Sequence, residues 1–315
     1  MLPGMNTYDI AVIGGGAAGL SAALVLARAR REVVVIDDGR PRNAPATHMQ
    51  GFLSRDGMPP AGLLAVGRAE VAGYGGEFVD QTVSGLMRSP NGTFGVLLKD
   101  GGTLLARRVL VTTGLSDRLP DIAGVVERWG RDLLHCPYCH GHEVRDQPLG
   151  VLGGTPGAVQ HALLIRQWSP DVVFFAHTTE LTDSDRERLT ARAIGIVEGE
   201  VDRLVVEDDR LCAVELVDGR RVPRTAVFVR PEFVGNNALV RGLGARTDDA
   251  GWPLVDAGGL TSVPGLWAAG NAVNPRAQVI TAAGEGSAAA IAMNNDLAEE
   301  DVRDAVEAFR TVRPT

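Results

Sequence analysis

The sequence is poor in lysine, in cysteine and in aromatic residues. Lys99 is the single lysine, so arginine carries nearly all of the positive charge, and the formal net charge is −8. Because no basic run offsets this balance, we do not expect a nucleic-acid partner. Three cysteines are too few, and an odd number, for the disulfide framework of a small secreted protein.

The N-terminus also lacks the basic, apolar and cleavage regions of a secretory signal. Residues 10–27 carry no charge, but their clustered glycines predict a strand, a turn and a helix rather than a membrane span. We therefore expect a cytoplasmic protein without a membrane partner. A chain of 315 residues exceeds what one core usually serves, which predicts two domains.

The first third of the chain has the pattern of a dinucleotide-binding unit. A β-branched strand at 8–13 leads into a glycine-rich turn, an alanine-rich helix to about Arg30 and a second strand at 33–36. The turn reads G-x-G-x-x-G, and an acid follows about 20 residues later. Its first glycine allows the turn, the second lets a pyrophosphate approach, and the third lets helix pack on strand. The candidate residues are Gly14, Gly16, Ala17, Ala18, Gly19, Asp38 and Asp37, the last for the ribose hydroxyls.

Two later segments resemble the places where flavoprotein reductases return to FAD. A strand at 104–113 runs into Thr113 and Gly114, and a strand within 261–271 ends at Gly270 and Asn271. Asn271 stands where these enzymes usually carry aspartate, and its amide oxygen can still accept a ribityl hydroxyl. A small-residue helix then opens at Gln278 and Val279 and reaches about Asn295, with its N-terminal amides expected to face the flavin. The charged tail after Leu297 predicts a last helical turn followed by disorder.

The segment between these half-sites repeats the strand-loop-helix-strand plan with an altered loop. Strands are predicted at 149–152 and 171–175, with a helix to about Gln167 between them. Thr155 stands where the middle glycine belongs, and a side chain there blocks a pyrophosphate. Two threonines and Glu180 follow the second strand where arginines usually hold a 2′-phosphate, although Glu180 could serve the ribose of NADH. We interpret the segment as a Rossmann scaffold that does not use NAD(P)H.

The most reactive stretch lies in this segment, at Cys136-Pro137-Tyr138-Cys139-His140, between His135 and His142. A C-x-x-C-H sequence can cycle electrons, hold a metal or attach a haem. Haem attachment normally requires export, and a structural zinc site requires four well-spread ligands, whereas Cys212 is remote in sequence. We therefore expect redox chemistry and no metal. Cys212 itself, in an apolar strand at 211–216, is predicted to be a small buried hydrophobe.

By these residues the chain resembles the low-molecular-weight thioredoxin reductase family from Tyr8 to about Leu297. It is most similar to the FAD-dependent dithiol oxidases of the gliotoxin and holomycin type. His140 replaces the aspartate that usually follows the second cysteine, the second glycine fingerprint and paired arginines are missing, and Ala277 replaces an arginine before Gln278. The resemblance implies an α/β fold of two Rossmann-like, doubly wound domains. An FAD-binding domain, 1–118 and 244–315, would hold an inserted NAD(P)H-like domain, 119–243.

The resemblance also implies that Cys139 faces the flavin and that Cys136 exchanges with the substrate. A small dithiol would attack this disulfide and leave as a disulfide, and the electrons would pass through FAD to O2, giving hydrogen peroxide. Histidine titrates near neutral pH, so His140, with His135 and His142 behind it, is expected to be the base. A homodimer is implied as well. Two alternatives stay open: an NAD(P)H-dependent thioredoxin or small-disulfide reductase, and a flavin-bound redox sensor without turnover.

Overall fold

The computed structural model describes residues 7–312, which divide into two compact units. Of the described residues, the first unit comprises 7–42, Ala61–Ser116 and 235–312, and the second comprises Asn43–Pro60 and Asp117–Val234. The chain therefore passes between the units four times, and the segment 43–60, predicted to lie in the FAD-binding domain, groups with the second unit. The third passage lies close to the predicted boundary at 118, and the fourth lies earlier than the predicted 243. These last two passages use strands β7 (Leu115–Arg118) and β16 (Glu232–Gly235), which form a two-stranded sheet.

The first unit is built on a seven-stranded sheet in the order β3-β2-β1-β6-β5-β4, with β17 also paired to β6. Strands β1, β2, β3, β6 and β17 run parallel, and β4 and β5 form an antiparallel extension. The strands are β1 (Thr7–Ile13), β2 (Val33–Asp37), β3 (Glu77–Asp80), β4 (Val83–Arg88), β5 (Phe94–Leu98), β6 (Thr103–Val111) and β17 (Leu266–Ala268). The helices are α1 (Ala17–Arg28), α2 (Pro60–Gly73), α7 (Ala238–Gly242), the 3₁₀ turn η1 (Gly270–Ala272) and α8 (Val279–Val312).

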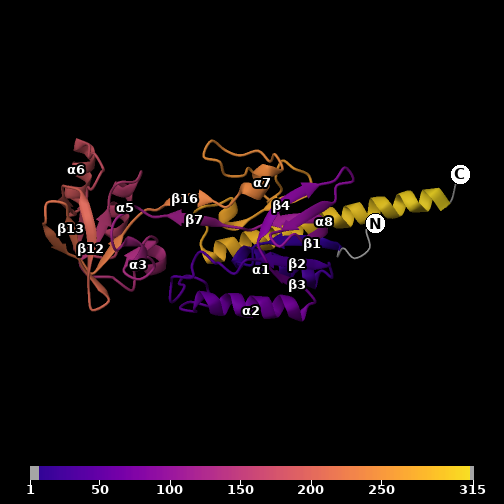
Figure 1. Ribbon diagram of the computed structural model, residues 1–315, viewed down its shortest axis with the longest axis horizontal. Coiled ribbons are helices and arrows are strands. Elements are labelled where there is room, and N and C mark those ends of the chain that lie inside the picture. Colours follow the sequence, from indigo (N-terminus) through magenta and orange to yellow (C-terminus); the bar gives the residue numbers. More distant parts are fainter. Residues whose placement is uncertain (1–6, 313–315) are drawn as a thin grey trace. The chain divides into compact units, whose positions relative to one another are not determined.

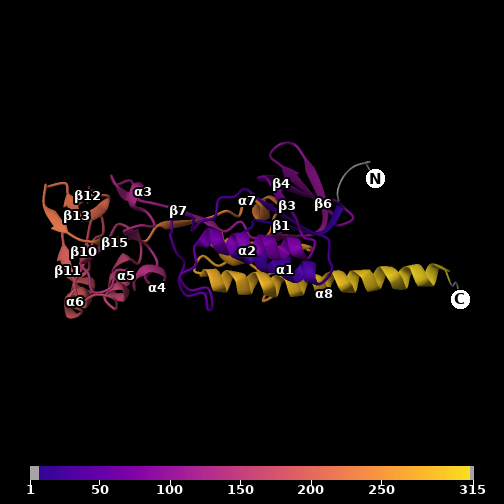
Figure 2. The same ribbon diagram turned by 90° about the horizontal axis from the view of Figure 1, so that it is seen from below.

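Alternation along the central strand β1 places apolar side chains on both faces of this sheet. Ile10 and Val12 pack with α1 and α8, whereas Ala11 and Ile13 pack with Phe94 and the α7 region. Helices α1 and α8 run side by side, as Figures 1 and 2 both show. A Cβ on Gly286 of α8 would overlap the Ala18 carbonyl oxygen, so this glycine allows the close crossing.

The C-terminal tail differs from its prediction, because α8 continues as a helix to Val312. Its second half extends past the sheet of this unit (Figures 1 and 2). Two arginines of β6 anchor the helix: Arg108 Nε lies 2.6 Å from Asp296, and Arg107 lies 2.7 Å from Glu300. The charges that suggested disorder are therefore partly ion-pair partners that hold this part of the helix to β6.

The second unit contains a five-stranded parallel sheet in the order β11-β10-β9-β15-β8 and an antiparallel three-stranded sheet, β12-β13-β14. Its parallel strands are β8 (Leu133–Leu134), β9 (Leu149–Leu152), β10 (Val172–Phe175), β11 (Gly195–Val197) and β15 (Ala226–Phe228). The antiparallel strands are β12 (Val201–Glu207), β13 (Arg210–Leu216) and β14 (Arg221–Pro223). The helices are α3 (Val125–Arg128), α4 (Pro137–His140), α5 (Ala158–Ile165) and α6 (Asp183–Ala191).

Each unit thus carries the strand-loop-helix-strand arrangement predicted for it, as β1-α1-β2 in the first and β9-α5-β10 in the second. The predicted α/β fold of two Rossmann-like units is confirmed. Within 7–312, none of the helices combines the length and the apolar character that a bilayer crossing demands.

Candidate functional site

The loop between β1 and α1 has the shape of a phosphate cradle. Gly14 has φ +107°, and a Cβ there would lie 2.5 Å from the Thr112 carbonyl oxygen. A Cβ on Gly19 would overlap the Gly14 carbonyl oxygen, so both glycines are needed for the loop to close. A Cβ on Gly16, at the N-terminus of α1, would meet no atom within 4 Å. Gly16 therefore leaves an open space beside helix amides, which suits a pyrophosphate group.

The two acids after β2 have different surroundings. Asp37 accepts a hydrogen bond from the backbone N–H of Gly15 at 2.9 Å, which holds its carboxylate against the glycine loop. Asp38 is exposed and pairs with Arg40, whose Nε lies 3.0 Å away. Ala17 is the first residue of α1, and Ala18 is buried. The position of Asp37 fits the predicted role toward ribose hydroxyls.

The second half-site meets the first through small residues. A Cβ on Gly270 would lie 2.9 Å from the Ala18 methyl group, and a Cβ on Gly114 would lie 3.9 Å from the Asn271 Cβ atom. Thr113 donates its hydroxyl to the Asn236 carbonyl oxygen at 2.7 Å. The structure thus brings together segments that are more than 150 residues apart in sequence, as the two-half-site interpretation requires.

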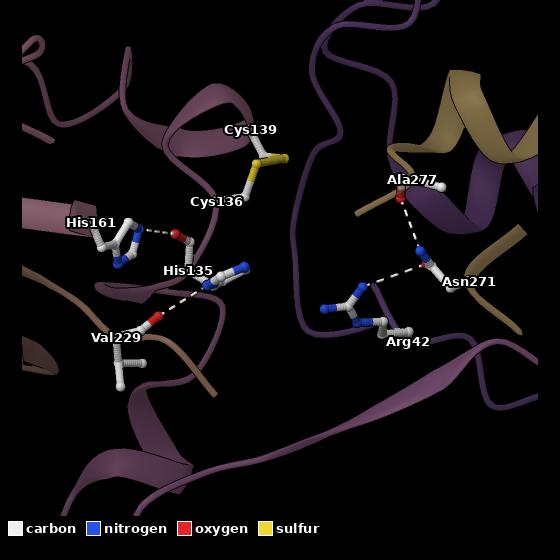
Figure 3. Close-up of a disulfide and its surroundings, with 8 residues drawn as sticks. All are labelled: Arg42, His135, Cys136, Cys139, His161, Val229, Asn271 and Ala277. Atoms are coloured by element: carbon white, nitrogen blue, oxygen red, sulfur yellow. Dashed lines mark hydrogen bonds between the residues drawn. A yellow bond between two sulfur atoms is a disulfide. The ribbon is translucent and has the colours of Figure 1, made fainter. Parts of the chain in front are cut away.

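Both polar atoms of the Asn271 side-chain amide make hydrogen bonds (Figure 3). Its Nδ2 donates to the carbonyl oxygens of Asn274 at 2.9 Å and Ala277 at 3.0 Å, and its Oδ1 accepts from Arg42 at 3.4 Å. An aspartate could not make the two donations, so asparagine organises the loop that leads to Gln278 and Val279, where α8 begins. The amide oxygen is turned away from that loop.

Sequence reasoning missed Glu285, which supports the same turn. Its carboxylate accepts from the backbone N–H of Gly270 at 3.0 Å and from Asn274 Nδ2 at 2.7 Å. It is the sole charged residue between the start of α8 and Asp296, which is the signal that could have identified it. Arg42, the partner of Asn271, carries no comparable signal in the sequence.

In the second unit Cys136 and Cys139 form a disulfide, with their Cα atoms 5.2 Å apart (Figure 3). Cys136 precedes the short helix α4, and its carbonyl oxygen accepts the N–H of Cys139 at 3.2 Å and of His140 at 3.1 Å. Tyr138 packs edge-on against Trp168 at 5.5 Å between ring centres. The pair therefore lies on one tight helical turn, fixed against the rest of this unit.

His135 and His161 lie next to the disulfide segment. His135 Nδ1 lies 3.1 Å from the Val229 carbonyl oxygen, and His161 Nε2 lies 2.9 Å from the carbonyl oxygen of His135 (Figure 3). Since a carbonyl oxygen only accepts, each of these ring nitrogens carries a hydrogen. Burial, with His135 adding to it, lowers the pKa of His161 to about 3. His135 was predicted from the sequence as a site residue, whereas His161 was not.

The other two histidines of the motif differ in exposure. His140, the last residue of α4, is half-buried, and burial lowers its pKa below the usual range while Glu143 opposes this shift. His142 is exposed. His140 is thus neutral near pH 7, the form in which an imidazole accepts a proton.

A cavity of about 370 Å³ lies at the loop between β9 and α5 of the second unit. Thr155 is among its lining residues, together with Thr179 and Asp185. Thr179 accepts the backbone N–H of Gly154 at 2.6 Å, just as Asp37 accepts that of Gly15 in the first unit. Thr179, rather than Glu180, therefore occupies the place of the ribose-binding acid. The described lining residues include no arginine or lysine.

Cys212 lies on β13 as predicted, but it is only half-buried, and its thiol donates to the Val205 carbonyl oxygen at 3.4 Å. Its strand belongs to the small antiparallel sheet β12-β13-β14 and not to the parallel sheet of this unit. In the described part of the chain no group of three or more His, Cys, Asp or Glu side chains has the arrangement of a metal site.

Residues 8–286 match the family described as pyridine nucleotide-disulphide oxidoreductase. The chain belongs to this family. A solved structure of HlmI shares 59% of its residues and covers 99% of this chain and 98% of its own, with a TM-score of 0.96. An oxidoreductase from Agrobacterium tumefaciens shares 31%, covering 92% of this chain and 98% of its own with a TM-score of 0.86. Thioredoxin reductase sirT of Leptosphaeria maculans is 30% identical over 92% of this chain and 94% of that protein.

The predicted resemblance to thioredoxin reductase-like proteins is confirmed by these matches. Membership of the family implies flavin binding. The prediction that the protein is an FAD-dependent disulfide oxidoreductase is therefore confirmed. The residues present fit FAD, because the β1-α1 loop is open only at Gly16 and the acid at the end of β2 faces that loop.

Proposed function

We propose that this protein is an FAD-dependent dithiol oxidase that forms an intramolecular disulfide in a small dithiol, such as a natural product, and reduces O2 to hydrogen peroxide. The observation that carries the proposal is the altered second nucleotide loop. In this loop Thr179 accepts the hydrogen bond of the Gly154 backbone N–H, and Asp185 is the single charged residue among those that line the cavity. Thr155 also places a side chain where the pyrophosphate of NAD(P)H would have to approach the loop backbone. The electrons are then expected to enter through the cysteine pair.

The proposed reaction at the cysteines is a thiol-disulfide exchange. One substrate thiolate attacks Cys136, a mixed disulfide forms and the Cys139 thiolate leaves. The second substrate thiolate then attacks the mixed disulfide, so the substrate departs as a disulfide and the protein holds two reduced cysteines. When bound, FAD would supply a two-electron acceptor for the reduced cysteines, which return to the Cys136–Cys139 disulfide, and O2 would be the final acceptor of the two electrons and two protons.

Two histidines are proposed to hold the protons released by the thiols. His140 is neutral near pH 7 because of its burial, and it follows Cys139 directly. His135 precedes Cys136 and is oriented by its hydrogen bond to Val229. An imidazolium formed at either position favours a thiolate beside it, because it is a nearby positive charge.

The flavin is proposed to be held by the residues of the first unit. Gly14, Gly16, Ala17, Ala18, Gly19, Asp37 and Asp38 form the first half-site, and Thr113, Gly114, Gly270, Asn271, Gln278 and Val279 form the second. The 59% identity to HlmI and the 30% identity to sirT both support a flavin site of this kind.

The rival function, an NAD(P)H-dependent disulfide reductase, is favoured by one observation, the cavity at the β9-α5 loop. An anaerobic titration separates the two. Purified yellow protein is mixed with NADPH or NADH and then with dithiothreitol, while the flavin absorbance is followed. Bleaching by the dithiol alone, with hydrogen peroxide on admitting air, is the expected result. Rapid bleaching by a nicotinamide nucleotide contradicts the proposal, and no bleaching by either reagent indicates a redox sensor.

Serine variants provide matched controls for the role of the disulfide. Cys139→Ser is expected to abolish bleaching by the dithiol, whereas Cys212→Ser, which removes the third thiol, is expected to bleach at the wild-type rate. Equal bleaching of the wild type and Cys139→Ser would mean that the dithiol reduces the flavin without the disulfide.

We further propose that the protein works as a cytoplasmic homodimer in which α8 supplies part of the interface. Apolar side chains on this helix remain exposed, namely Ile291 at 54%, Val302 at 62% and Val306 at 42%. Exposed apolar residues that cluster on one element mark interaction surfaces. Sedimentation of the wild type as a dimer and of Val302→Asp/Val306→Asp as a monomer is the expected result, and equal masses would contradict it.

A further inference from the structure

His161 is almost completely buried, at 6% exposure, although it carries two polar ring atoms. It lies on α5 and donates Nε2–H to the carbonyl oxygen of His135 at 2.9 Å. Among residues 7–312, no group hydrogen-bonds its Nδ1, which is also shielded from solvent. A buried polar atom without a partner opposes folding, so an apolar residue would serve the core better here.

The ring of His161 also contacts the ring of His135. Their centres are 5.6 Å apart, and Phe233 meets His135 edge-on at 5.2 Å from another direction. The Val229 carbonyl oxygen accepts from His135 Nδ1 (Figure 3). In the neutral ring of His135, the lone pair is then on Nε2. Three neighbours therefore fix the orientation and the tautomer of a histidine that directly precedes Cys136.

We propose that His161 is a positioning residue, which holds the backbone and the ring of His135 so that His135 takes up the proton of the Cys136 thiol. The inference rests on the proposed function, since it gives His135 the role of base for the cysteine pair. The proton moves from the Cys136 sulfur to His135 Nε2, which leaves a thiolate and an imidazolium.

His135 and His161 have different proposed roles because their surroundings differ. His161 stays neutral, since burial opposes its charge and the groups that face it, His135 and Arg230, add no negative charge. It can therefore donate its hydrogen bond at every pH at which the protein works. His135 is half-buried, and its Nδ1–H keeps a carbonyl acceptor when the ring becomes charged.

The proposal is tested by the pH dependence of Cys136 alkylation. Anaerobic holoprotein is reduced with a phosphine and treated with iodoacetamide between pH 5 and pH 9, and labelling is read by mass spectrometry. The variants are His161→Leu, His161→Gln, His135→Phe, the double variant of His161→Leu with His135→Phe, and His177→Phe as a control in the same unit. Glutamine can place an N–H where His161 Nε2 lies, so it can replace the hydrogen bond.

We expect the midpoint for Cys136 labelling to rise by about one pH unit in His161→Leu, which is roughly tenfold less thiolate at a given pH below the midpoint. His161→Gln should restore the midpoint, and His177→Phe should leave it unchanged. His135→Phe should raise it as well, and the double variant should show no further rise, because residues that act through one another are not additive.

An unchanged midpoint in His161→Leu, with only a lower melting temperature, overturns the proposal, because His161 would then be a packing residue. Additive shifts in the double variant also overturn it, because His161 would then act independently of His135. Should the leucine variant not fold, His161→Phe takes its place. The labelling needs neither dithiol substrate nor O2, so its outcome is separate from a failure of the proposed oxidase activity.

Discussion

Replacing Gly16 with alanine is expected to separate FAD binding from folding. Gly16 has φ −78° and ψ −172°, which any L residue can adopt, and its new methyl group would meet no atom within 4 Å. A glycine-to-alanine change without strain stabilises a protein by about 0.4–1 kcal/mol, and the loss of a glycine N-cap to alanine costs roughly as much in the opposite direction. The apoprotein of Gly16→Ala should therefore stay within about 1 kcal/mol of the wild type.

The same methyl group fills the space into which the pyrophosphate of FAD must fit. Overpacking by one methyl group costs about 1–3 kcal/mol, which corresponds to roughly 5- to 150-fold weaker binding. The neighbouring Gly19→Ala should behave differently, because its Cβ overlaps the Gly14 carbonyl oxygen and the backbone must move. That variant should lose stability even without FAD.

The assay combines urea unfolding of the apoproteins with FAD titrations followed by flavin fluorescence. Gly73→Ala is the matched control, because a Cβ at this last residue of α2 also meets nothing within 4 Å. Wild-type FAD affinity in Gly16→Ala would mean that the pyrophosphate does not occupy the space beside Gly16. A loss of apoprotein stability equal to that of Gly19→Ala would mean that this space is not open in the apoprotein.

Three further predictions concern other parts of the molecule. Asn271→Asp removes two hydrogen bonds to loop carbonyl oxygens and should cost about 2 kcal/mol in urea unfolding; an unchanged midpoint contradicts this. His161 has a folded pKa of about 3, below its unfolded value, so the unfolded state binds more protons and stability falls as the pH drops below about 6.5. Between pH 6.5 and pH 5 the free energy of unfolding should fall by about 2 kcal/mol through His161. If His161→Gln loses as much stability over the same range, His161 is not the source. Glu300→Ala removes the ion pair to Arg107 of β6 and should speed amide hydrogen exchange after residue 298. Replacement of the exposed Asp304 by alanine should not change this exchange. Equal exchange in both variants would show that the ion pair does not hold the helix to β6.

Much of the fold could be predicted because the two nucleotide-binding patterns are local. The strand at 8–13, its glycine turn and the helix that follows are specified by adjacent residues, and the structure has β1 and α1 there. The end of α8 could not be predicted in this way. Its charged residues at 296–301 suggest solvent and disorder when read alone, whereas in the structure several of them meet arginines of β6 that are almost 200 residues away.

The sequence alone was enough to predict the kind of chemistry, from a C-x-x-C pair flanked by histidines, two candidate flavin half-sites and a second nucleotide loop with threonine in place of glycine. These features depend on residue type and spacing, which are local properties. Only the tertiary structure decided which residues support them. Glu285, Thr179 and His161 act through hydrogen bonds to backbone groups at least 15 residues away, and a single sequence does not record such contacts.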